Sequence, residues 1–167
     1  MIFCLGLVRL PIRSPRLRKS PSAPALISVS WKLHLKKAKK EHARAMVIGI
    51  QADMWNPAAI TATTNELSNY TPIVQKLADL VEDFGGPVLL LNGDSHVYGS
   101  DQPLADPSSS TGSIYHTQPV PNLTRVTVQG STTAPSEWLR LTIDTRSHQP
   151  FSWENVAYCN DPTVTCQ

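Results

Sequence analysis

Two polar clusters in this sequence follow apolar runs, and their residue types could bind a metal ion. The second cluster places a carboxylate and an imidazole two residues apart, at Asp94 and His96. Such a pair directly after a strand can face one cation. The first cluster adds an amide and another carboxylate, at Gln51 and Asp53. These four side chains are the candidate metal ligands, and a simple turn is the alternative, because Asn-Gly-Asp is also a common turn sequence.

The apolar runs before the two clusters predict buried strands. Residues 45–50 and 87–91 are short, apolar and rich in β-branched residues or leucine. A helical pattern precedes each run, over 31–44 and over 71–84, and the second helix has Thr71 as its expected N-cap. The order helix, strand, helix, strand predicts an α/β fold in which the two strands are parallel.

Parallel strands bring their carboxyl ends to the same edge of a sheet, where ligands bind in open α/β folds. We therefore expect Gln51 and Asp94 at one rim, with their Cα atoms within about 12 Å, or two to three strand spacings. The histidines outside the clusters are expected to be incidental; they are His34, His42, His116 and His148.

The second half of the chain reads as a long loop followed by strands. Residues 99–121 are rich in Ser, Pro, Asp and Gly, which is typical of a functional or disordered loop. Residues 123–130 and 138–144 alternate apolar and polar, and the link between them predicts a hairpin. The chain after residue 151 is expected to be irregular.

Positive charge is concentrated at the start of the chain. Eleven of the 15 Lys and Arg residues lie within residues 1–44, together with a single acid, Glu41. Such an arm could bind nucleic acid or a membrane surface. Residues 9–25 show no hydrophobic period, so a disordered or misassigned start is the favoured interpretation, and nucleic acid is not an expected partner.

Targeting signals are weak. Arginines follow the short apolar start instead of preceding it, which is the wrong order for a secretory signal, although the composition also resembles a transit peptide. No apolar run approaches the roughly 18 to 20 residues of a membrane span, so a soluble protein of unknown location is expected.

Cys159 and Cys166 could pair in an oxidising compartment or remain thiols. Two Asn-x-Thr patterns, at Asn69 and Asn122, would matter only in a secreted protein.

Two motifs and their order resemble a known enzyme family. The segment PVLLLNGDSHVY resembles the late strand and loop of the calcineurin-like metallophosphoesterases, with Asp94 in place of the first histidine of the family's Gly-His-x-His. The segment VIGIQADMW resembles the preceding strand, with Gln51 near another ligand histidine and Asp53 close by. A loop like DQPL and a closing stretch like NLTRVTVQGS…WLRLTID follow, so the resemblance covers residues 31–158.

The resemblance implies the C-terminal part of a layered α/β/β/α sandwich that hydrolyses phosphoesters with divalent metal ions (Mn, Mg, Fe or Zn). The three motifs that come earlier in the family do not occur ahead of these two segments: Asp-x-His, Gly-Asp-x-x-Asp and Gly-Asn-His. In the family they supply most ligands of the first metal, the bridging aspartate and a catalytic histidine. This departure suggests a truncated product, a mispredicted frame or a degenerate relative.

We therefore expect three parts: a basic arm (1–30), a partial metallophosphoesterase-like domain (31–158) and a short tail (159–167). The domain is expected to bind one divalent ion weakly and to be inactive as written, which leaves open whether the chain is an enzyme. The alternative is a non-catalytic interaction or structural domain that uses the basic arm.

Overall fold

The computed structural model describes residues 4–7, 23–56, 58, 66–130 and 137–157. Two α-helices and two short 3-10 helices are present in this part of the chain: α1 (Ala23–Lys40), η2 (Glu66–Tyr70), α2 (Thr71–Phe84) and η3 (Gly112–Ile114). Its strands are β1 (Cys4–Leu7), β2 (Met46–Gly49), β3 (Val88–Asn92), β4 (Gly99–Asp101), β5 (Leu123–Thr127), β6 (Glu137–Ile143) and β7 (Phe151–Ala157).

Five strands form one mixed sheet in the order β1-β2-β3-β5-β4. The first four are parallel to one another, and β4 runs antiparallel to β5. The register of the central pair places Met46 opposite Val88 and Gly49 opposite Leu91. The predicted α/β class and the predicted parallel neighbours at 45–50 and 87–91 are therefore confirmed.

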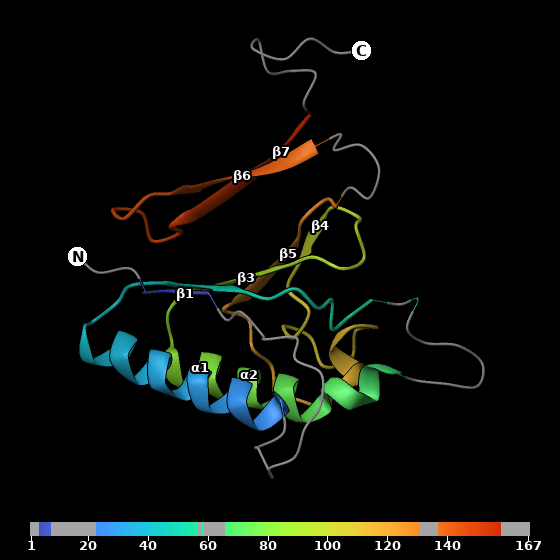
Figure 1. Ribbon diagram of the computed structural model, residues 1–167. Helices are drawn as coiled ribbons and strands as arrows, with labels where there is room; N and C mark the ends of the chain where they lie inside the picture. Colours follow the sequence, from blue (N-terminus) through green and yellow to red (C-terminus); the bar gives the residue numbers. More distant parts are fainter. Residues whose placement is uncertain (1–3, 8–22, 57, 59–65, 131–136, 158–167) are drawn as a thin grey trace, which may run out of the picture.

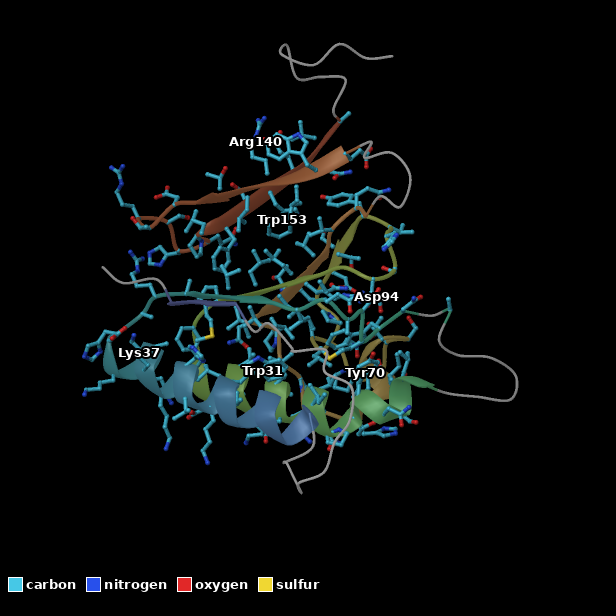
Figure 2. The ribbon with its side chains drawn as sticks, viewed as in Figure 1. Trp31, Lys37, Tyr70, Asp94, Arg140 and Trp153 are labelled. Carbon is cyan, nitrogen blue, oxygen red and sulfur yellow. The ribbon has the colours of Figure 1, made fainter. Side chains whose placement is uncertain are left out.

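The sheet separates two layers (Figure 1), with α1 and α2 on one face and the β6–β7 hairpin on the other. Successive strand residues point to opposite faces, so Val88 and Leu90 join the core under the helices while Leu89 joins the core under the hairpin. The helical core is the larger one. The hairpin contributes half-buried apolar side chains, and Figure 2 shows Trp153 on its sheet-facing side and Arg140 on its outer side.

Helix α2 covers the centre of the sheet and follows from a regular apolar stripe. Six of its side chains are buried: Ile73, Val74, Leu77, Ala78, Leu80 and Val81. Pro72 lies in its first turn, where a missing N–H costs nothing. Gly85 ends the helix in the left-handed conformation, with φ of 74°, and its N–H donates to Val81 O. Thr71 is the first helical residue; Tyr70, not Thr71, holds the cap position.

Helix α1 begins at Ala23, eight residues before the predicted start, and ends at Lys40. The expected domain boundary at residue 30 therefore falls inside a helix. Residues 9–25 contain several prolines and show no hydrophobic period, so the sequence pattern did not predict this early helix start. Pro24 nevertheless lies in the first turn of α1, where proline is tolerated. Ahead of it, β1 pairs with β2, with Cys4 opposite Met46. Residues 1–3 and 8–22, the remainder of the expected arm, lie outside the described residues.

The predicted hairpin between 123–130 and 138–144 is wrong. β5 instead lies parallel to β3 in the main sheet, whereas β6 pairs antiparallel with β7, with Ile143 opposite Phe151. An alternating apolar and polar pattern predicts a half-buried strand, but it does not identify the strand with which that segment pairs. The chain after residue 151 was expected to be irregular, yet it forms β7. The long loop likewise contains β4 and η3.

Two further expectations concern the ends of the chain and the membrane. The cysteine pair at 159 and 166, and the tail around it, lie outside the described residues. Among the helices that the structure describes, none is long and apolar enough to cross a membrane.

The Asn122 side chain joins α2 to the sheet, which yields a stability prediction. Its Nδ2 donates to Val81 O at 3.0 Å and to Gly86 O at 2.9 Å. Asn122→Ala should lower the free energy of unfolding by about 1–3 kcal/mol, since two carbonyls lose a donor. Asn69→Ala is the matched control, because Asn69 is exposed and lies in the other Asn-x-Thr pattern; it should change stability by less than about 0.5 kcal/mol. Urea denaturation measures both, and equal losses would contradict the assignment.

Candidate functional site

The ends of β2 and β3 meet at one rim of the sheet, as the sequence predicts. Gln51 Nε2 donates a hydrogen bond to Asp94 Oδ1 at 3.1 Å, and Gly93 N donates to Gln51 O at 3.2 Å. Both side chains are exposed, and Asp94 lies beyond the carboxyl end of β3 (Figure 2). Gln51 and Asp94 meet because the parallel register of β2 and β3 ends both strands at the same level of the sheet.

The turn after β3, residues 93–96, has an unusual backbone. Asp94 has φ of 74° and His96 has φ of 60°, so two non-glycine residues within three positions are left-handed. Asp and His tolerate this region better than most residues, yet each such residue costs of order 1 kcal/mol or more. Left-handed histidines also occur singly at His42 and His116. Two left-handed non-glycine residues in one four-residue turn make this turn a candidate functional site.

The His96 ring lies against the backbone that follows β5. A Cβ atom on Gly130 would come within 2.7 Å of both Cγ and Cδ2 of His96, so a larger residue there would displace the ring from this position. Val128 N donates to Asn92 O at 2.8 Å and keeps the chain after β5 beside the end of β3. The ends of three neighbouring strands therefore surround the turn that carries Asp94 and His96.

Asp53 has other partners than the rim residues. Its Oδ1 accepts hydrogen bonds from Trp55 N at 3.0 Å and from Arg125 Nη1 at 2.9 Å. Arg125 also makes two parallel bonds to Asp101, from Nε and Nη2, both at 2.8 Å. Asp53 is 6% exposed. A buried carboxylate requires a partner of this kind, so Asp94, not Asp53, is the carboxylate that accompanies Gln51.

An aromatic pair supports this ion-pair network. The Arg125 guanidinium lies over the Trp55 ring, 5.2 Å from its centroid, and Trp55 meets Tyr115 edge to face at 5.6 Å. Tyr115 OH donates to Met54 O. Burial raises the pKa of Tyr115 above its ordinary value, with smaller contributions in the same direction from Tyr70 and Asp53. The hydroxyl therefore stays protonated and remains a donor.

Arg125 and Asp101 were not among the residues singled out from sequence. A signal for Arg125 existed: it lies on the same face of β5 as Leu123 and Thr127, which are both buried. A charged residue on the buried face of a strand requires a charged partner. The sequence does not reveal which carboxylate supplies it, because Asp53 and Asp101 are 72 and 24 residues away.

Within the described residues, no three His, Cys, Asp or Glu side chains converge in a way that could hold a metal ion. Asp94 and His96 supply one carboxylate and one imidazole, and Gln51 supplies an amide. These donors do not by themselves fit a dinuclear centre. The assignment of the rim residues as metal ligands stays a prediction.

A cavity of about 530 Å³ lies beside the turn. Its lining combines the ion-pair network with residues of the turn, of β4 and of the segment after β2: Asp53, Trp55, Asn56, Ala58, Ser95, Val97, Tyr98, Gly99, Ser100, Asp101, Arg125 and Thr127. The volume lies within the usual range of small-molecule sites.

No protein-family model, curated protein or solved structure matches this chain.

The ion-pair network yields a direct test. Arg125→Ala leaves Asp53 buried without its charge partner and should lower the free energy of unfolding by about 3–5 kcal/mol. Arg140→Ala is a matched control, since Arg140 also pairs with a carboxylate, Glu154, at 3.0 Å and lies over a tryptophan, but is exposed. Its loss should stay below about 1 kcal/mol. Chemical denaturation measures the free energy of unfolding of both variants. Similar losses of stability would show that the buried network contributes no more than a surface ion pair.

Proposed function

We propose that this chain is the C-terminal part of a metallophosphoesterase-type phosphoester hydrolase. In this account Gln51, Asp94 and His96 form part of a metal-binding rim, and the chain alone does not hydrolyse phosphoesters. The observation that carries the proposal is the contact between Gln51 and Asp94 at the carboxyl ends of adjacent parallel strands. The resemblance in the sequence implies the same meeting of these two strand ends.

The layer order supports the same proposal. Helices, a mostly parallel sheet and a β-hairpin follow one another through the molecule (Figure 1). We interpret them as the C-terminal part of an α/β/β/α sandwich, with β6 and β7 as strands of its second sheet. The hairpin core is only half-buried on the side of β6 and β7. That is the exposure expected of a second sheet with few strands.

The rim residues differ in what they could do for a cation. The Asp94 carboxylate and the His96 imidazole are the metal-binding groups, and Gln51 orients Asp94 through its Nε2–H donor. A carboxylate in place of an imidazole favours hard cations such as Mg²⁺ or Mn²⁺ over softer ions. When bound, a metal ion in such a site supplies charge that activates water and stabilises a phosphoester oxygen.

A two-metal phosphoesterase needs its ions about 3.5–4 Å apart to hold the attacking and leaving oxygens. Asp94 and His96 cannot supply the ligands of two ions. We therefore assign no hydrolytic step to this chain alone. The missing ligands would correspond to the three earlier family motifs, which do not occur ahead of the segments that carry Gln51 and Asp94.

Metal binding tests which histidine belongs to the rim. We expect His96→Ala to weaken Mn²⁺ binding at least tenfold, because it removes the only imidazole of the rim, and His116→Ala to leave it unchanged. His116 is a close control, since it is also exposed and left-handed, with φ of 51°. Calorimetric titration measures both variants. Equal affinities would remove His96 from the site.

Activity provides a separate test of the partial-site account. With Mn²⁺ added, the chain should hydrolyse p-nitrophenyl phosphate no faster than the buffer does. Absorbance of the released nitrophenolate measures the rate. Robust turnover that disappears in His96→Ala would show that the chain holds a complete centre.

A further inference from the structure

The cavity and the rim share one wall. Ser95 and Val97 line the cavity, and they alternate along the turn with Asp94 and His96 of the rim. A molecule bound in the cavity would therefore lie next to a group bound at the rim. Rim and cavity together could hold the two ends of one ligand.

The charges of the cavity disfavour an anion. Its lining includes two carboxylates, Asp53 and Asp101, and one cation, Arg125, so its formal charge is negative. Both carboxylates pair with the same guanidinium, and Asp94 adds negative charge just outside. No lysine or histidine lies among the lining residues that the structure describes. A phosphate would find no uncompensated positive charge there.

The cavity nevertheless offers both donors and acceptors. Arg125 has five N–H groups, of which three are used in the bonds to Asp53 and Asp101, so two remain. Each carboxylate also keeps unused lone pairs, because it has about four acceptor sites. Val97, which is 69% exposed, and Tyr98 add apolar surface to the wall.

We propose that this cavity binds an uncharged, hydroxyl-rich group, such as a polyol or sugar. A hydroxyl donates to a carboxylate and accepts from a guanidinium, which matches the mixed lining better than a pure anion or a pure cation. The C–H groups of a polyol can pack on Val97 and Tyr98. Resting on the proposed function, this group is the alcohol part of the phosphoester whose phosphate lies at the rim.

The test uses metal-free protein, so that it does not depend on the rim. We expect myo-inositol to shift the amide signals of Tyr98, Ser100 and Asp101 saturably in a ¹H–¹⁵N NMR titration. Inorganic phosphate and choline serve as the anionic and cationic probes, and neither should shift these signals. Saturable shifts with phosphate or choline alone, or no saturable shift with any probe, would overturn the proposal.

Variants that fill the cavity locate the binding. Ser100→Trp should weaken inositol binding at least tenfold, whereas Ser152→Trp, at an exposed serine on another strand, should not change it. Val97→Trp fills the same cavity from the position directly after the turn and replaces Ser100→Trp if that variant does not fold. Equal affinities in the cavity variant and in Ser152→Trp would place the inositol elsewhere and contradict the proposal.

The experiments distinguish a failure of the proposed metal rim from a failure of the polyol assignment. Inositol binding without Mn²⁺ binding would reject the metal rim and keep the cavity. Mn²⁺ binding that depends on His96, without inositol binding, would keep the rim and reject the polyol assignment.

Discussion

The parallel register of β2, β3 and β5 is the constraint on which the rest of the site depends. It ends three strands at one level, so that Gln51, the turn of residues 93–96 and Gly130 become neighbours. A one-residue slip of β3 would send its alternate side chains to the wrong face, because Leu89 and Leu90 pack into different cores. Burial on both faces of the sheet therefore fixes the position of the rim.

Arg125 links segments on either side of β5. From β5 it reaches Asp53 after β2 and Asp101 in β4, so one guanidinium ties the segment after a central strand to the edge strand. The same contacts form part of the cavity wall next to the turn. Buried ion pairs of this kind often add little net stability but tolerate no loss of one partner. In this molecule the network gives shape and charge to the cavity, while the parallel strands position the rim.

The sequence predicted the parts of the fold that rest on local patterns. The apolar runs and the stripe of α2 were enough for the two central strands and their common rim, and hence for the meeting of Gln51 and Asp94. Partners of alternating strands could not be predicted, because β5 and β6 look alike as patterns and β7 was not recognised as a strand. In the fold, β5 belongs to the main sheet, whereas β6 and β7 pair with each other and pack on Val47, Leu89 and Val126 of that sheet. The role of Asp53 was hidden for the same reason: its partner, Arg125, is distant in sequence.

The central claim is that the turn carrying Asp94 and His96 is part of a metal site, and Mn²⁺ itself can report where it binds. The paramagnetic ion broadens the NMR signals of nearby nuclei, so a substoichiometric titration of the metal-free chain maps its position. The account predicts that the amides of residues 51 and 93–97 broaden first and that His96→Ala removes this selectivity. Broadening that begins at other exposed acids, such as Asp79 and Asp83 on α2, and ignores the turn would contradict it.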